Sequence, residues 1–449
     1  MRRLLPIALA GALLTVAPAG AQQTTRSLDV AYTQFDLPNG LHVILHEDHT
    51  VPLVTVNVWY HVGSAREKIG RTGFAHLFEH LMFMGSKHAP YGDFDRLLEG
   101  AGGTNNASTA EDQTNYYIDI PSSALDLALF LESDRMGYLL DAMSPKTVDA
   151  QRDVVKNERR ESFENAPYGM ASIEIAQMLY PKGHPYSWPT IGYMEDLTAA
   201  SYDDVVQFFK MYYQPSNASL VIAGDIDPAK TRASVEAWFA DVKPGAVPVG
   251  PIDYPHPDLR EVKKKTIQDH VQLPRLYLTW ITPSHLAPGD AELDVLSLLL
   301  AGGKNSRLYK RLVYDLQIAQ DVSAYQASKS LSSEFQIVVT ARPDASIDRI
   351  RAIVDEEIQR IQQAAPTEHE FQRAINQVES SFYDRMERIG ENGGVADQMN
   401  SYYQETGNPA YFNEDLSRYR ALAPDDIQAV ALKFLPLTRR VELVVEPSK

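Results

Sequence analysis

The chain has 449 residues, of which 44% are hydrophobic and 22% are charged, a composition typical of folded globular domains. Its 42 lysines and arginines against 59 aspartates and glutamates give a net charge of 42 − 59 = −17. We therefore expect no nucleic-acid partner, because nucleic acids attract clustered positive charge. Cysteine is absent, which excludes disulfides, thiolate ligands and cysteine nucleophiles and leaves histidine and carboxylate side chains to bind any metal.

The first 21 residues have the pattern of a secretory signal peptide. Arg2 and Arg3 precede an apolar run over 4–17, and Ala19-Gly20-Ala21 forms a small-x-small cleavage pattern. The apolar run is shorter than the ~20 residues that a transmembrane helix needs. We therefore predict a signal peptide over 1–21, a mature protein without a membrane span, and a periplasmic or secreted location.

Two sequence matches at the same spacing indicate that one unit is used twice. Pro52 and Pro274, each at the start of an apolar strand, are separated by 274 − 52 = 222 positions. Asp204 and Asp426 each end an Asp-Asp pair ahead of an amphipathic helix, where anionic side chains are favoured, and 426 − 204 is again 222. A chance likeness would not repeat one offset at both ends of a unit, so the matches predict a duplication.

The two predicted halves are separated by a linker rich in proline and glycine over 242–262, which disfavours both helices and sheet hydrogen bonding. The N-terminal half spans 22–241 and the C-terminal half spans 263–449. In each half, strands alternate irregularly with long helical patterns such as 123–140 and 348–364. We therefore predict an α+β fold in which each half is a mixed β-sheet covered by helices.

The segment His76-Leu77-Phe78-Glu79-His80 lies in an apolar, helix-forming stretch of the first half. On a helix, His76 and His80 project from one face a single turn apart, so both imidazoles can bind one Zn²⁺ ion. Glu79 lies beside them, close enough to bond a water molecule on the metal without binding the metal itself. This H-x-x-E-H order is the reverse of the commoner H-E-x-x-H zinc motif. The alternative is a pair of core histidines with an exposed acid.

A catalytic zinc site needs a third protein ligand and one open position. Glu158, Glu161 and Glu164 all lie in one acidic, helical stretch downstream of the motif. Composition does not choose among the three, and a run of this kind is more often a solvated helix face.

The sequence resembles the pitrilysin/insulinase family of zinc peptidases, and specifically their short, processing-peptidase-like branch, over essentially the whole mature chain. The matching segments are 73–83 around the motif, Gly102-Gly103, Asn106-Ala107, Thr109, Thr114, Tyr116 and 152–158. The resemblance implies that Glu158 is the third ligand, 158 − 80 = 78 residues after the second histidine, with Glu161 and Glu164 left to the solvent or to a supporting role. It also implies that the first half alone binds the metal, since the second half has Leu298 and Gly302 where the histidines would stand.

The resemblance implies an endopeptidase in which Zn²⁺ polarises the scissile carbonyl and activates water, while Glu79 takes the proton from the water and passes it to the leaving amine. The stretch 104–117 is expected to be an edge strand to which an extended or unfolded peptide adds as a further strand, with Asn106 and Ala107 in contact with it. Without the family match, Asn105-Asn106 reads equally well as a simple turn. Gln151 stands where many members have a further glutamate, which we expect to weaken metal affinity modestly.

One departure from the family concerns the second half, where active single-chain members carry an arginine and a tyrosine that hold the substrate and stabilise the oxyanion. In a helix expected to continue through 312–320, Val313 stands at the arginine position and Gln320 at the tyrosine position. Loss of such a donor typically costs ~10²–10³ in rate. Arg311 or Tyr314 would serve only after a shift in register.

We therefore predict that the chain is the zinc-bearing subunit of a heterodimer. A homologous partner without the histidine motif would supply the arginine and tyrosine, and the two chains would enclose a chamber that admits unfolded peptides. Two alternatives remain. In one, the chain is a non-catalytic peptide-binding or assembly subunit with a retained zinc site; in the other, zinc activates water for hydrolysis of a small molecule.

Overall fold

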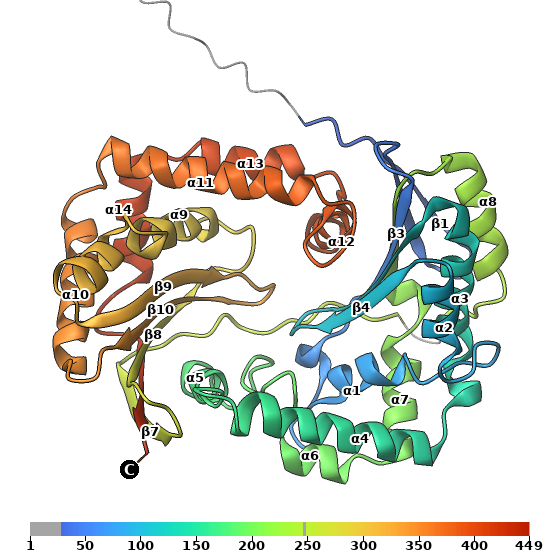
Figure 1. Ribbon diagram of the computed structural model, residues 1–449, viewed down its shortest axis with the longest axis horizontal. Helices are drawn as coiled ribbons and strands as arrows, with labels where there is room; N and C mark the ends of the chain where they lie inside the picture. Colours follow the sequence, from blue (N-terminus) through green and yellow to red (C-terminus); the bar gives the residue numbers. More distant parts are fainter. Residues whose placement is uncertain (1–27, 246–247, 449) are drawn as a thin grey trace, which may run out of the picture.

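A computed structural model describes residues 28–245 and 248–448, so the predicted signal peptide over 1–21 lies outside the described residues. Two halves lie side by side, each built on one β-sheet with helices packed against it (Figure 1). The predicted α+β fold with two halves is confirmed. Within the described ranges, no helix is both long enough and apolar enough to cross a bilayer.

The sheet of the first half has six strands in the order β1-β2-β6-β3-β5-β4. The β2–β6 pair is parallel and every other pair in it is antiparallel. Its strands are β1 (Thr33–Asp36), β2 (His42–Glu47), β3 (Leu53–Tyr60), β4 (Thr104–Thr109), β5 (Thr114–Pro121) and β6 (Ala218–Gly224). The central β3 is rich in β-branched and aromatic residues, and all but its first residue are buried.

The sheet of the second half has five strands in the order β7-β11-β8-β10-β9. They are β7 (Lys263–Asp269), β8 (Arg275–Thr282), β9 (Ala319–Ala327), β10 (Ser333–Ala341) and β11 (Val441–Pro447). The β7–β11 pair is parallel, like β2–β6. The strands β3 and β8 are related by the predicted offset, since 275 − 53 and 282 − 60 both equal 222.

Helices cover the sheets in both halves (Figure 1). The first half contains α1 (Phe74–Leu81), α2 (Asp93–Gly100), α3 (Leu125–Ala142), α4 (Pro145–Arg159), α5 (Ala171–Leu179), α6 (Met194–Ala199), α7 (Tyr202–Tyr212) and α8 (Pro228–Phe239). The second half contains α9 (Asp290–Ala301), α10 (Ile347–Gln363), α11 (Glu368–Met386), α12 (Val395–Thr406), α13 (Phe412–Arg420) and α14 (Pro424–Phe434). Shorter helical segments are η1 (Ser64–Arg66), η2 (Ser122–Ala124), η3 (Arg160–Glu164), η4 (Pro215–Asn217) and η5 (Tyr309–Asp315).

The two Asp-Asp pairs do begin equivalent helices, as the repeat predicts. The carboxylate of Asp204 accepts a hydrogen bond from the Ser201 amide, and that of Asp426 accepts one from the Ala423 amide. Each aspartate thereby satisfies a backbone N–H that the first turn of α7 or α14 leaves without a helical partner.

One helix of each half packs against the sheet of the other half (Figure 1). Ile175 and Leu179 of α5 pack on strands of the second sheet, whereas Met399 of α12 packs against Ile44 and Val221 of the first sheet. The two helices occupy nearly equivalent positions in the repeat, because 171 + 222 = 393 and α12 begins at residue 395. The halves are therefore interlocked by reciprocal apolar contacts.

Two expectations about individual elements are wrong. The single edge strand expected over 104–117 is a hairpin, in which β4 forms the edge of the sheet and β5 pairs with β3. A turn at 110–113 separates the two strands, closed by a hydrogen bond from the Ala110 amide to the Gln113 carbonyl. The helix expected over 312–320 ends at Asp315, because β9 begins at Ala319 and pairs with β10.

Candidate metal centre

The start of α1 is fixed by contacts that leave no room for a side chain. Gly73 precedes the helix at a φ of +86°, and a Cβ there would lie 3.0 Å from the Gly192 Cα and 2.9 Å from the Ile191 carbonyl. Thr72 adds a hydrogen bond of 2.7 Å from its hydroxyl to Asp196. Glycine therefore permits both the left-handed turn and the close approach of two backbone segments at this point.

A buried glutamate caps the same end of α1. The Glu67 carboxylate accepts hydrogen bonds from the amides of Gly73 at 2.9 Å and Ala75 at 2.8 Å. Burial raises the pKa of Glu67 to about 8, since it outweighs the stabilising backbone bonds. Sequence reasoning missed Glu67, although an acidic residue shortly before a helix that starts at glycine is a recognisable capping signal.

His76 and His80 lie on α1 as predicted, and Glu158 in the last turn of α4 faces both. The distance from Glu158 Oε1 to His76 Nε2 is 3.6 Å, and that from Oε2 to His80 Nε2 is 3.1 Å. One nitrogen or oxygen from each of the three side chains lies within 4.8 Å of the other two. Two imidazoles and one carboxylate are a donor set that suits Zn²⁺ and leaves a fourth coordination position open.

The electrostatics of these side chains favour metal binding. Burial lowers the pKa of His76 to about 4, so its imidazole is neutral near pH 7. Hydrogen bonding with His80 lowers the pKa of Glu158, which keeps that carboxylate ionised. A neutral imidazole and an ionised carboxylate are the protonation states that bind a cation.

Glu79 points from α1 to the edge strand of the sheet. The Thr109 hydroxyl, at the end of β4, donates a hydrogen bond of 2.6 Å to Glu79 Oε2. Burial raises the pKa of Glu79 although this hydrogen bond opposes the shift. Sequence reasoning noted Thr109 only as part of a matching segment and assigned it no contact with Glu79.

The last turn of α4 is tied to the loop that meets the start of α1. The Arg159 side chain donates to the Gly192 carbonyl at 3.0 Å and pairs with Glu164 at 2.8 Å. Both helices of the site therefore rest on the segment around Gly192. Glu161 is exposed and Glu164 is engaged by Arg159, so neither joins the histidine cluster.

The other residues singled out in the sequence lie around this cluster. Asn106 is exposed and Ala107 half-buried on β4, whose outer edge pairs with no other strand of the described residues. The Gln151 amide, on α4, donates to Met84 Sδ at 2.8 Å, just beyond the end of α1. Its contact is therefore with the chain that follows the motif.

Arg311 and Tyr314, the two residues of the second half considered as substitutes for the family's arginine and tyrosine, are not placed for that role. The Arg311 guanidinium pairs with Glu356 and Glu357 on α10, and the Tyr314 side chain is 73% exposed. Val313 lies on η5, whereas Gln320 lies on β9 rather than on a helix.

An inverted H-x-x-E-H motif on one helix, a glutamate from a second helix and an edge strand beside them, in the first of two equivalent α+β halves, are the arrangement expected of a metallohydrolase. Residues 42–174 match the profile of Insulinase (peptidase family M16), and residues 199–378 match that of the peptidase M16 inactive domain. The chain belongs to this insulinase (M16) peptidase family.

Relatives and solved structures agree with this assignment. The chain is 28% identical to a zinc protease, PqqE, of Helicobacter pylori over 379 residues, which cover 84% of this chain and 85% of the relative. It is 26% identical to an uncharacterised zinc protease of Streptomyces coelicolor over 412 residues, 89% of this chain and 86% of that one. A crystal structure of an H. pylori protease superposes with a TM-score of 0.86 at 26% identity, covering 93% of this chain and all of that one.

Proposed function

We propose that this protein is a zinc-dependent endopeptidase that cleaves extended or unfolded peptides. The observation that carries the proposal is the convergence of His76, His80 and Glu158, with Glu79 held beside them at the edge strand β4. Relatives named zinc proteases support the same reaction class.

The donor atoms of His76, His80 and Glu158 would hold the zinc ion. When bound there, Zn²⁺ would act as a Lewis acid on the scissile carbonyl and lower the pKa of water. Glu79 stands next in the motif as the base that accepts a proton from water and returns it to the leaving amine. Its burial and its bond to Thr109 suit this role, because a raised pKa brings a carboxylate closer to neutral pH and the bond fixes its orientation.

The unpaired edge of β4 would bind the substrate as an added strand. Backbone hydrogen bonds along an edge do not depend on side chains, so they suit peptides of varied sequence. Asn106 and Ala107 lie in the middle of this strand and are our proposed contacts. The requirement for an extended backbone would exclude folded proteins and favours peptides over small molecules.

We further propose that the active form is a heterodimer with a homologous subunit that lacks the histidine motif. The Arg311 guanidinium is already paired with two carboxylates of α10. Val313 and Gln320 have no group able to replace the missing arginine and tyrosine. A partner would supply the oxyanion donors from its own second half. The signal-peptide pattern at the N-terminus supports a periplasmic or secreted location for this chain, which cell fractionation would test.

The test uses the chain alone and co-purified with a homologous neighbour, each assayed on an internally quenched peptide with parallel zinc analysis. Glu158→Gln should lose zinc and activity together, whereas Glu79→Gln should keep zinc and lose activity. Glu161→Gln is the matched control, since this exposed glutamate lies three residues from Glu158, and it should keep both. Full activity of the lone chain would refute the heterodimer, and activity retained by Glu79→Gln would refute the catalytic role in favour of peptide binding.

A further inference from the structure

The tips of two equivalent hairpins meet where the halves face each other. The β4–β5 turn of the first half occupies 110–113, and the β9–β10 turn of the second half occupies 328–332. The two hairpins are equivalent in the sheets, because β5 pairs with β3 as β10 pairs with β8, and β3 and β8 are 222 residues apart, although the two turns differ in length and position. The first hairpin carries the proposed substrate strand, so this contact links the metal-free half to the site.

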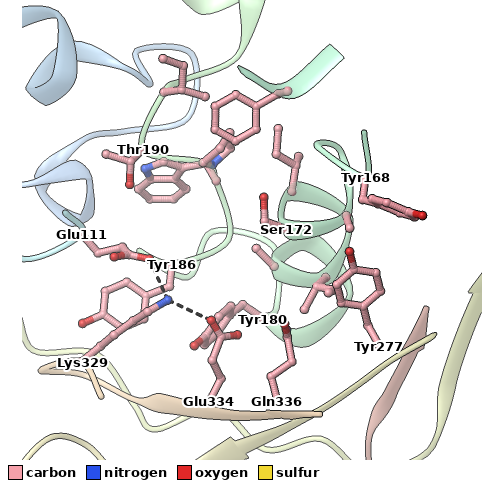
Figure 2. A pocket seen from close by; sticks show the side chains of 18 of the residues that line it. Glu111, Tyr168, Ser172, Tyr180, Tyr186, Thr190, Tyr277, Lys329, Glu334 and Gln336 are labelled. Carbon is pink, nitrogen blue, oxygen red and sulfur yellow. Dashed lines mark hydrogen bonds and ion pairs between the residues drawn. The ribbon is translucent and has the colours of Figure 1, made fainter. Parts of the chain in front are cut away.

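A lysine of the second half is inserted between two carboxylates at this contact. Lys329 Nζ lies 2.7 Å from Glu111 of the first hairpin and 3.3 Å from Glu334 of its own hairpin (Figure 2). Its side chain is 17% exposed and lies over the Tyr186 ring, with Nζ 5.4 Å from the ring centroid. These groups line one end of a cavity of about 400 Å³ between the halves.

The charges at this contact depend on one another. Burial disfavours ionisation of Glu111, but the neighbouring Lys329 charge and its hydrogen bond outweigh burial and hold the pKa of Glu111 below its usual range. Burial likewise opposes the charge on Lys329, and the carboxylates of Glu334 and Glu111 raise its pKa despite that. Removing one partner of such a buried ion pair costs free energy, because the other charge is left buried and unpaired.

A second set of bonds ties the same turn to the second half. The Asp112 carboxylate accepts from the Ser330 amide at 3.1 Å and from the Tyr186 hydroxyl at 2.7 Å. The Leu331 amide in turn donates to the Tyr186 hydroxyl at 2.9 Å. Glu111 and Asp112, the two central residues of the first turn, are thus both bonded to the opposite hairpin.

The backbone of that turn is fixed from the first half as well. The Ser64 amide donates to the Ala110 carbonyl at 3.1 Å, and the Ala65 amide donates to the Glu111 carbonyl at 2.8 Å. A Cβ at Gly63 would lie 2.3 Å from the Ala110 oxygen, so the two segments are in closest contact. Loss of the contacts from the second half would therefore loosen the turn without releasing it.

Glu111 is two residues beyond Thr109, which donates the 2.6 Å hydrogen bond to Glu79. We propose that Lys329, in the half without the zinc motif, is a positioning residue that fixes Thr109, and through it Glu79, by its ion pair with Glu111. This inference rests on the proposed function, in which Glu79 is the general base. It assigns the metal-free half a part in aligning the catalytic group, exerted through Glu111 and Thr109.

The test compares Lys329→Met and Glu111→Gln with Glu334→Gln in the chain bound to its partner subunit, on the quenched peptide. Glu334→Gln is the matched control, because it removes the other carboxylate around Lys329 and leaves the link between the hairpins in place. We expect Lys329→Met and Glu111→Gln each to lower kcat by about tenfold with KM and zinc content unchanged, since small misplacements of catalytic groups cost up to ~10²-fold. The double variant should be no slower than the slower single variant. Glu334→Gln should lower kcat by less than either of these variants, because Lys329 keeps its ion pair with Glu111.

Wild-type kcat in both Lys329→Met and Glu111→Gln would overturn the inference, and so would an equal loss in Glu334→Gln, which would indicate general damage to the contact. If Lys329→Met does not fold, Glu111→Gln alone decides, because it keeps the shape of the side chain. Failure of the proposed function is recognised separately, because the Glu79→Gln variant would then have the same peptidase activity as the wild type. If activity is lost in Glu79→Gln but retained in Lys329→Met and Glu111→Gln, only the present inference is refuted.

Discussion

Glu67 offers a test of how α1, the helix that carries the H-x-x-E-H motif, is held in place. It is buried, accepts two amide hydrogen bonds at the start of α1 and has a pKa raised from 4.5 to about 8, with Asp196 as the nearby like charge. Between these pH values the folded chain holds a proton that the unfolded chain has released, so stability falls as pH rises. The shift of 8 − 4.5 = 3.5 units corresponds to a loss on the order of 5 kcal/mol across that range.

Glu67→Gln removes this dependence because glutamine does not titrate. We expect the difference in unfolding free energy between wild type and Glu67→Gln to fall by about 1.4 kcal/mol per pH unit up to pH 8 and then to level off. Urea titrations in the presence of a chelator measure it without a contribution from metal binding, and Glu161→Gln serves as the exposed control. A difference that stays constant from about pH 5 to 9 would show that Glu67 is ionised in the folded protein and would refute the reasoning.

Three further outcomes follow from particular contacts. Arg135→Met should cost about 3–5 kcal/mol of unfolding free energy in urea titrations, because it leaves the Glu132 carboxyl group, at 0% exposure, without its ion-pair partner; equal stability would contradict this. Tyr168→Phe should cost about 1 kcal/mol in the same measurement, since the hydroxyl donates to the Leu273 carbonyl at 2.8 Å, and no loss would show that water replaces that bond. Chelation should abolish peptide cleavage and lower the unfolding free energy by about 4 kcal/mol relative to protein with free zinc at a thousandfold excess over its Kd, and both should return on adding Zn²⁺.

The site could be predicted from the sequence where its geometry is local. His76, Glu79 and His80 share one helix, so their spacing alone places them on one face. Glu158 comes from a different helix, and the residues around it gave three equal candidates until the family resemblance chose one. The distances now agree with that choice, because Glu158 lies within reach of both histidines while Glu161 is exposed.

Errors in the predicted elements come from turns without the usual signals. The turn between β4 and β5 has Glu111 and Asp112 at its centre and contains no glycine, proline or asparagine, so Asp112 is its one turn-favouring residue and the hairpin read as one strand. The second error lies at Gln317, which adopts a φ of +51° between η5 and β9. A non-glycine residue in the left-handed region is a tertiary outcome that local pattern does not reveal.

Contacts between the halves are the part that no local pattern could reveal. α5 and α12 each cover the sheet of the opposite half, and each sheet must bury its apolar face under such helices. The hydrophobic periodicity of either helix is equally compatible with packing on the sheet of its own half, so it does not predict the exchange. The same holds for Lys329, which reads in the sequence as an ordinary surface lysine of a loop. Its role appears only when the two hairpins are placed together.

Duplication explains why one half has lost the metal motif while the contact between halves persists. At the 222-residue offset, the histidines correspond to Leu298 and Gly302, and Leu298 packs against the apolar core of the second half. A helix without metal ligands is free to bury apolar side chains and so to stabilise its half. The packed second half supports the β4–β5 hairpin through Lys329, because an ion pair from Lys329 can position Glu111 only as well as Lys329 is itself held, and Glu334 of its own hairpin helps to hold it. The specialisation of the two halves is therefore complementary: one presents the ligands and the base, and the other provides the fixed surface against which they are aligned.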